Sequence, residues 1–199
     1  ILKKLKNLKI IISLGAGVDH ILKLPSYKNT PIIRIQDPNM RSRMLNHVLS
    51  QILIYQLKLN EYNKAQQKNI WLDERLTALN MDLTIGILGL GYLGKFIANK
   101  LKSLNYNVIG YKNTVSTGKS QIPIHYKKSL KTFLKLSDIV VSVLPATIQT
   151  RDLINKSFLN QMKKKSLLIN IGRGSSLNEI DLFNHSQRNK YFFASLDVF

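Results

Sequence analysis

Residues 83–94 read LTIGILGLGYLG, an apolar run that leads into a Gly-x-Gly-x-x-Gly loop. In such a loop Gly89 permits the tight turn, Gly91 lets the backbone approach a pyrophosphate, and Gly94 lets strand and helix pack closely. The context is the required one, because a strand precedes the loop, a helix follows it, and a second strand comes within about 30 residues. The stretch therefore predicts a dinucleotide-binding unit of the Rossmann type.

Strands and helices alternate from this loop onward. The first helix begins at Tyr92 and Leu93, and its positive N-terminal end attracts a diphosphate, so we count both as cofactor-binding residues. The sequence pattern predicts strands over residues 83–88, 107–111, 138–144, 166–171 and 191–198, and helices over residues 92–104, 129–136, 155–164 and 177–186. Ser176 and Glu179 form a capping-box pattern for the last helix. This alternation predicts an α/β fold with a doubly wound parallel sheet.

The residues before the loop predict short strands and one long helix. Strands are expected over residues 8–14 and 31–35, with a short helix over 18–24 between them. Apolar residues at helical spacing predict a helix over residues 40–67, about 40 Å long. Its apolar stripe is wide enough to be covered on two sides. Both a domain connector that also packs on a partner chain and a core helix of a single domain fit this pattern.

The composition excludes several classes of protein. The chain has no cysteine, which excludes disulfides and thiolate metal sites, and we expect no metal. No apolar run has the length of a membrane span, and the Lys-rich start at residues 1–18 lacks a cleavage site, so we expect a cytoplasmic protein without a membrane partner. The net charge of +19 raises nucleic-acid binding as a hypothesis, which predicts steep salt dependence. Because the lysines are scattered and no aromatic residues are interleaved, we expect no nucleic-acid partner.

The end of the second expected strand bears on the choice of cofactor. An acidic residue there accepts a hydrogen bond from the ribose 2′-hydroxyl of NAD, whereas this strand is followed by Lys112, Asn113 and Thr114. Lys112 would attract a 2′-phosphate, and Asn113 could hydrogen-bond to it. The sequence therefore favours NADP(H). If Lys112 is simply one more surface lysine, NAD(H) remains the alternative.

Three further segments lie at the ends of expected strands, at residues 143–151, 170–174 and 196–199. The carboxyl ends of parallel strands are where ligands bind in such sheets. Glycines on both sides of Arg173 leave its guanidinium uncluttered, and an arginine can bind a carboxylate with two parallel hydrogen bonds. Arg173 is therefore a candidate for binding an acidic substrate.

At this point the sequence resembles the D-isomer-specific 2-hydroxyacid dehydrogenase family, most closely its glyoxylate/hydroxypyruvate reductase A branch. The matching stretches span essentially the whole chain and lie at residues 13–20, 37–38, 43–44, 89–94, 144–145, 147, 150–151, 170–174 and 196–199. The resemblance implies a partial substrate-binding lobe at 1–39, a hinge and dimerisation helix at 40–69, and an NAD(P)-binding domain at 70–199. It also implies a homodimer.

The resemblance implies roles for the substrate-binding residues. Arg173 matches the catalytic arginine, which binds the substrate carboxylate and polarises the keto oxygen. The backbone N–H groups of Ala16 and Gly17 match a cradle for the same carboxylate. The implied reaction is hydride transfer from the nicotinamide to C2 of a small 2-keto acid of the glyoxylate or hydroxypyruvate type, which gives the D-2-hydroxy acid.

The resemblance also implies roles along the cofactor. Asp197 matches the residue that holds the nicotinamide carboxamide, and Pro145 and Ala146 would line the side of the cleft between adenine and ribose. Ala146 replaces a bulkier apolar residue of the relatives, and Asn46 stands where they often carry an acid.

One part of the family's machinery has no match in this chain. The general acid is a histidine paired with a glutamate, and the resemblance places both beyond Phe199, while the four histidines present match no catalytic position. We therefore expect a fragment with little turnover of its own, because a general acid contributes about 10²–10⁴-fold. The alternative function is a non-catalytic module that binds a dinucleotide and regulates a partner.

Overall fold

The computed structural model describes residues 2–5, 7–15, 17–73, 77–114 and 120–199. The chain divides into two compact units, residues 1–40 and residues 41–199. The first unit holds a small parallel sheet with its connecting helices, which are η1 (Leu2–Lys4), β1 (Ile11–Ser13), α1 (Asp19–Leu22) and β2 (Ile32–Arg34). Ser13 is buried here, whereas Ile12 and Ile33 are more than half exposed. The expected elements of this region are present, and each is shorter than predicted.

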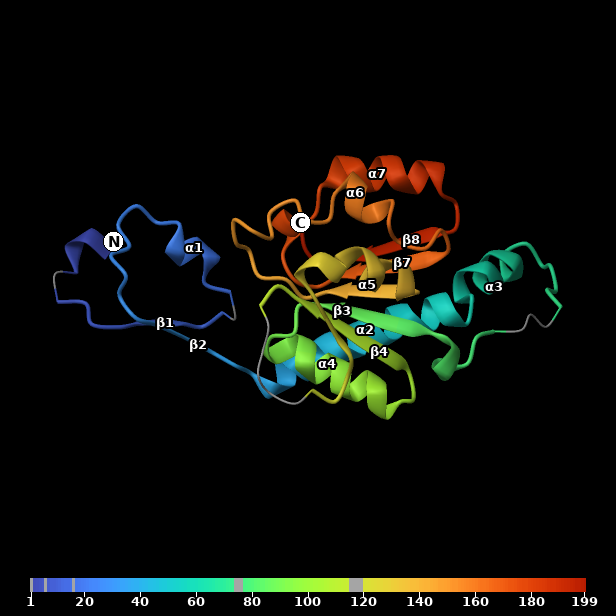
Figure 1. Ribbon diagram of the computed structural model, residues 1–199, viewed down its shortest axis with the longest axis horizontal. Helices are drawn as coiled ribbons and strands as arrows, with labels where there is room; N and C mark the ends of the chain where they lie inside the picture. The colour runs from blue at the N-terminus through green and yellow to red at the C-terminus, as the bar shows by residue number, and fades with distance from the viewer. Residues whose placement is uncertain (1, 6, 16, 74–76, 115–119) are drawn as a thin grey trace. The chain divides into compact units, whose positions relative to one another are not determined.

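The second unit is built on a parallel sheet, and Figure 1 shows its twist. Its described strands are β3 (Thr84–Leu88), β4 (Asn107–Lys112), β5 (Ile124–Tyr126), β6 (Ile139–Ser142), β7 (Ser166–Asn170) and β8 (Phe192–Leu196). They lie in the order β5-β4-β3-β6-β7-β8, and every pair is parallel. The chain winds outward from β3 to β5, then returns to β6 and winds the other way. The prediction of a doubly wound parallel sheet is confirmed.

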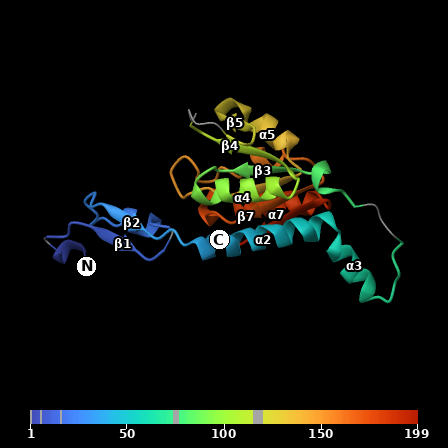
Figure 2. The same cartoon turned by 90° about the horizontal axis from the view of Figure 1, so that it is seen from below.

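Helices cover both faces of this sheet. The helical elements are α2 (Pro38–Gln56), α3 (Leu59–Gln66), η2 (Asn80–Asp82), α4 (Tyr92–Ser103), η3 (Lys127–Ser129), α5 (Leu130–Leu136), α6 (Lys156–Leu159), η4 (Gly174–Ser176) and α7 (Glu179–Arg188). Helices α2 and α4 lie on one face, and α5, α6 and α7 lie on the other (Figures 1 and 2).

The two faces have separate apolar cores. Ile85 and Ile87 of β3 pack toward α2 and α4, whereas Leu88 packs toward α5 and α6. All three side chains are fully buried. Successive residues of a strand point to opposite faces, so a strand covered on both sides reads as a continuous apolar run. This is why residues 83–88 could be recognised as a central strand.

The sequence predicted one continuous helix over residues 40–67, and this prediction was wrong, because the structure has two helices there. Helix α2 ends at Gln56 and α3 begins at Leu59. Between them Lys58 adopts φ 54°, in the left-handed region that terminates helices. Both views show α3 extending beyond the sheet.

Tertiary hydrogen bonds hold the end of α2 in place. The buried Gln56 donates from Nε2 to the carbonyl oxygen of Ala78 at 2.8 Å and to Oδ1 of Asn80 at 3.0 Å. Its Oε1 accepts a hydrogen bond from the Tyr106 hydroxyl at 2.7 Å. Because a buried side-chain amide needs hydrogen-bond partners, these contacts fix the place of Gln56 in the fold. Periodicity is a local pattern and cannot detect such partners, so it overextended the helix.

Three other local predictions differ from the structure. The edge strand β5 was not predicted, and α6 covers only part of the helix expected over residues 155–164. The expected capping box at Ser176 is wrong, because Asn178 is the N-cap of α7 and its Oδ1 accepts from the backbone N–H of Asp181 at 3.0 Å. Ser176 is instead buried and donates to the carbonyl oxygen of Arg173.

The described residues contain neither a helix that could span a membrane nor a cluster of side chains that could hold a metal ion. None of the helices there combines the length and the apolar content that crossing a membrane requires. In the same part of the chain, no three His, Asp or Glu side chains gather closely enough to hold a metal ion.

Candidate functional site

Five neighbouring strands, from β4 to β8, end at one side of the sheet, which we call the carboxyl edge. The backbone ladder continues one step past several strand ends. These bonds run from the N–H of Gly89 to the carbonyl oxygen of Tyr111 (3.0 Å), from Val143 to Leu88 (2.9 Å), from Ile171 to Ser142 (3.1 Å) and from Asp197 to Asn170 (3.0 Å). The first residues of four loops are thereby held at one level along the edge.

The glycine loop between β3 and α4 depends on close backbone packing. Gly89 has φ 104°, a conformation that side chains other than glycine rarely adopt. A Cβ atom at Gly94 would collide with the carbonyl oxygen of Gly89, so the first turn of α4 rests directly on the loop. At Gly91, by contrast, a Cβ would meet nothing within 4 Å. The loop is tight where it touches the sheet and open where it faces outward.

The start of α4 suits an anion. Gly91 is its N-cap and offers no side-chain acceptor, and the first turn contains no acidic residue. The last turn carries Lys100 and Lys102, which complement the negative end of the helix dipole. The N–H groups of the first turn of a helix lack intrahelical partners and bind anions readily. Tyr92 is exposed here, and Leu93 is half-buried.

Lys112 and Asn113 lie beside this loop. Lys112 is the last residue of β4, directly after Tyr111, whose carbonyl oxygen accepts from the Gly89 N–H. Its side chain is half-buried, and that of Asn113 is exposed. The structure therefore brings the predicted 2′-phosphate residues next to the predicted diphosphate loop.

Pro145 and Ala146 begin the loop after β6. Pro145 is exposed and Ala146 is half-buried. The hydroxyl of Thr150 donates to the carbonyl oxygen of Pro145 at 2.6 Å, which closes this loop on itself. A Cβ at Gly172 would lie 2.6 Å from the backbone nitrogen of Leu144, so this loop and the loop after β7 touch through their backbones.

Arg173 lies in the loop after β7 and is half-buried. Its Nη1 donates to the carbonyl oxygen of Gly172 at 2.7 Å. Its own carbonyl oxygen accepts from the Ser176 hydroxyl at 2.7 Å and from Nδ2 of Asn170 at 3.3 Å. The backbone of Arg173 is thus fixed from both sides.

Asn170 and Ser176 are positioning residues that the sequence reasoning missed. Both are fully buried, and Oδ1 of Asn170 also accepts from the Gly172 N–H at 3.2 Å. Buried polar side chains almost always have partners. An asparagine at the end of an otherwise apolar strand was the available signal that the next loop is held by side-chain hydrogen bonds.

Asp197 follows β8, and its side chain is exposed at the carboxyl edge. The chain after it passes so close to the loop after β7 that a Cβ at Gly174 would collide with the backbone of Phe199. The structure therefore brings the loops of Arg173 and Asp197 into direct contact. Of the predicted carboxylate cradle, Gly17 lies half-buried in the first unit, and Ala16 lies outside the described residues.

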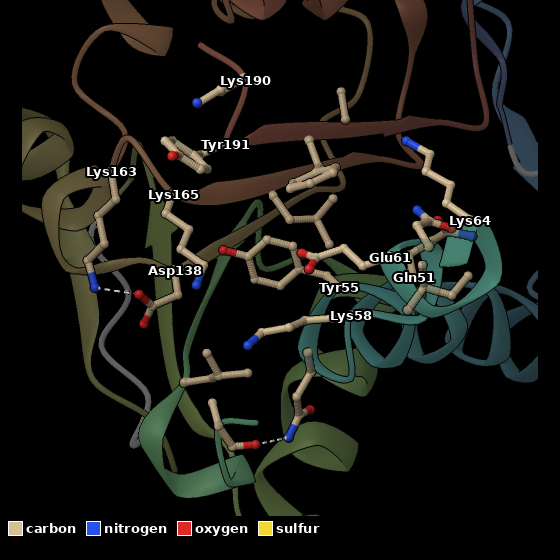
Figure 3. A pocket seen from close by; sticks show the side chains of 18 residues that line it. Gln51, Tyr55, Lys58, Glu61, Lys64, Asp138, Lys163, Lys165, Lys190 and Tyr191 are labelled. Carbon is tan, nitrogen blue, oxygen red and sulfur yellow. Dashed lines mark hydrogen bonds and ion pairs between the residues drawn. The ribbon is translucent and has the colours of Figure 1, made fainter. Parts of the chain in front are cut away.

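A cleft lies at the opposite side of the sheet, where the strands begin. This amino-edge cleft has a volume of about 1060 Å³ and contains none of the predicted site residues (Figure 3). The rings of Tyr55 and Phe193 meet edge to face at 5.7 Å between centroids. Burial, followed by the charge of Asp138, raises the pKa of Tyr55 to about 12, so its hydroxyl stays neutral. The charged residues that line the described part of the cleft are Lys58, Lys64, Lys163, Lys165, Lys190, Glu61 and Asp138.

Known proteins match this chain along nearly its whole length. The family model described as the D-isomer specific 2-hydroxyacid dehydrogenase, NAD binding domain, matches residues 49–199. The glyoxylate/hydroxypyruvate reductase A of Yersinia enterocolitica is 33% identical over 202 residues, and that of Photorhabdus laumondii is 34% identical over 200 residues. Each match covers 97% of this chain and 63% of the relative.

Solved structures give the same result. An NADPH-dependent glyoxylate/hydroxypyruvate reductase from Sinorhizobium meliloti, in complex with NADP and sulfate, has a TM-score of 0.91 and 30% sequence identity. A probable 2-hydroxyacid dehydrogenase from Rhizobium etli, in complex with NADP, HEPES and L(+)-tartaric acid, has the same TM-score and identity. Both matches cover 100% of this chain and 65% of the other. The chain spans less than two thirds of the length of these relatives.

The second and third glycines of the loop, Gly91 and Gly94, should respond differently to substitution. We expect Gly94→Ala to lower the free energy of unfolding by about 1–3 kcal/mol or more, because its methyl group collides with a backbone oxygen that cannot yield. Gly91→Ala, with open space around it, should stay within about 0.5 kcal/mol of the wild type. Urea unfolding of both variants measures the difference. Equal destabilisation by the two substitutions would contradict this description of the loop.

Proposed function

We propose, from the premise that this chain belongs to the D-isomer specific 2-hydroxyacid dehydrogenase family, that the protein is a reductase of small 2-keto acids. Its substrate would be of the glyoxylate or hydroxypyruvate type, its product the D-2-hydroxy acid, and its cofactor NADPH. The observation that carries this proposal is the convergence of four backbone-linked loops at the carboxyl edge. The functional roles of residues 1–39, 40–69 and 70–199 are part of the same proposal.

The residues at this edge fit an extended dinucleotide. Lys112 and Asp197 stand at the two ends of a row of five strand ends, about 19 Å apart at 4.8 Å per strand. Between them lie the open backbone at Gly91 and the positive end of α4, which suit a diphosphate. Lys112 would bind the 2′-phosphate with Asn113 beside it, which favours NADPH over NADH. The relatives of Sinorhizobium and Rhizobium, both in complex with NADP, support this choice.

When bound, NADPH supplies the hydride that reduces the keto carbon. Arg173 would hold the substrate carboxylate and polarise the keto oxygen, because its guanidinium presents parallel N–H donors from a backbone fixed by Asn170 and Ser176. Asp197 would accept a hydrogen bond from the nicotinamide carboxamide. Pro145 and Ala146 would contact the cofactor between adenine and ribose.

The cofactor assignment predicts a change of preference on substitution of Lys112. We expect Lys112→Met to weaken NADPH binding about 10-fold while NADH binding is unchanged, because one charge-assisted hydrogen bond to the 2′-phosphate is lost. Gly91→Val should abolish the binding of both cofactors in a folded protein. Fluorescence titration measures the affinities, with Lys135→Met on the exposed side of α5 as the control. An unchanged ratio of the two affinities in Lys112→Met would exclude the proposed role of this lysine.

The substrate assignment predicts a selective effect of Arg173. In the intact protein that supplies the family's general acid, we expect Arg173→Met to lower kcat/KM for glyoxylate about 100-fold or more, because two charge-assisted hydrogen bonds are lost. Arg173→Lys should recover part of the loss through its charge but not the paired geometry. The affinity for NADPH, measured by titration, should change by less than about 2-fold. If Arg173→Met binds NADPH normally and reduces glyoxylate at the wild-type rate, the arginine does not bind the substrate.

We also propose a homodimer in which residues 70–73 of one copy bind the amino-edge cleft of the other. Trp71 is 90% exposed and Ile70 is 53% exposed, which is unusual for large apolar side chains. In the sequence Trp71 is followed closely by the acidic residues Asp73 and Glu74, with Arg75 as the basic residue beside them. The cleft is lined by aromatic rings with five lysines against two acids in its described part. The segment and the cleft are therefore complementary in charge and in apolar character.

The dimer proposal predicts that Trp71 is an anchor. We expect Trp71→Ser to raise the dimer dissociation constant at least about 30-fold, the effect typical of a central aromatic residue. The control Ile180→Ser on α7 replaces another large apolar residue, which is 74% exposed, and should leave the dimer dissociation constant unchanged. Sedimentation velocity over a range of concentrations measures both. A Trp71→Ser dimer as stable as the wild type would rule out this interface.

A further inference from the structure

Arg41 on α2 lies against the helix that follows the glycine loop. Its Cζ is 4.2 Å from the ring centroid of Phe96 and 5.1 Å from that of Tyr92. The two rings stand one turn apart on α4, and Tyr92 directly follows the N-cap Gly91. Figure 2 shows α2 and α4 side by side on one face of the sheet. A guanidinium thus lies against the first two turns of the helix that follows the glycine loop.

This placement is electrostatically unfavourable in the free protein. The N-terminus of a helix carries a partial positive charge, and a cation near it is destabilising. The first turn of α4 has no acidic residue to compensate, and the Arg41 Nε is buried without a hydrogen-bond acceptor among the described residues. The two aromatic faces offset part of this cost by cation–π attraction. Local conflicts of this kind occur at functional sites, where a ligand resolves them.

We propose that Arg41 is a further cofactor-binding residue, whose guanidinium neutralises the diphosphate held at the glycine loop. This inference rests on the proposed function, since it concerns the same cofactor. The diphosphate is common to NADPH and NADH, so Arg41 contributes to both affinities and does not discriminate between them. In this it differs from Lys112, which faces the 2′-phosphate end. The rings of Tyr92 and Phe96 hold the guanidinium in place before the cofactor binds.

A purely structural role for Arg41 makes a different prediction. If the arginine served only to fasten α2 to α4, its loss would destabilise the protein in the absence of cofactor. If it serves to bind the diphosphate, its removal takes a cation away from the positive end of α4. The thermal midpoint of the cofactor-free protein should then stay the same or rise slightly, while the stabilisation added by NADPH should shrink.

The experiment compares the wild type with Arg41→Met, Arg41→Lys and the control Arg43→Met. Arg43 is exposed and lies two residues further along the same helix. Titration with NADPH and with NADH should show about 10-fold weaker binding of both by Arg41→Met, with their ratio unchanged, and partial recovery in Arg41→Lys. Arg43→Met should bind both cofactors as the wild type does. Thermal unfolding without cofactor completes the set.

The outcomes separate this inference from the proposed function. A wild-type protein that binds neither cofactor at millimolar concentration overturns the proposed function and this inference with it. If the wild type binds NADPH and Arg41→Met binds it equally well, the role of Arg41 is refuted while the function stands. The role of Arg41 is also refuted if the variant loses thermal stability without cofactor, or if it loses affinity for NADPH alone.

Discussion

The candidate site depends on backbone contacts that only glycine permits. At Gly94 the first turn of α4 rests on the carbonyl oxygen of Gly89, and at Gly172 the loop after β7 rests on the backbone of Leu144. The first contact seats a helix on its own loop and the second joins two loops, in each case without an intervening side chain. The ends of five parallel strands are therefore brought close enough to act on one extended ligand. Larger residues at these positions would push the loops apart, whatever polar groups the loops carried.

Charge is distributed unevenly over this strongly basic chain. The carboxyl edge combines the positive end of α4 with Lys112, Arg173 and Arg41, and Asp197 is an acidic residue at the same edge. Such an arrangement attracts anions, and both NADPH, with several negative charges, and a 2-keto acid, with its one carboxylate, are anions. The amino-edge cleft is also lined by lysines, but its aromatic floor and its volume suit a protein segment better than the phosphates of a dinucleotide.

Sequence reasoning succeeded where the physical signal is local or strictly periodic. The apolar run before Gly89 and the alternation after it were sufficient for the doubly wound sheet, because buried parallel strands and their helices impose those patterns. Sequence reasoning failed where contacts with residues distant in the sequence determine the local structure. Gln56 ends α2 through partners more than twenty residues away, and Asn178 caps α7 because Ser176 is used to hold Arg173. The place of Arg41 could not be predicted, since only the packing of α2 on α4 brings it against Tyr92 and Phe96.

The most direct test of the central claim is backbone hydrogen exchange of the protein with and without NADPH. We predict that the cofactor slows exchange at residues 89–94, at Lys112 and Asn113, and in the loop around Arg173, because these amides would lie under the bound dinucleotide. Exchange around Tyr55, Lys163 and Tyr191 in the amino-edge cleft should not change. Protection confined to the amino-edge cleft, with none at the glycine loop, would contradict the placement of the site at the carboxyl edge.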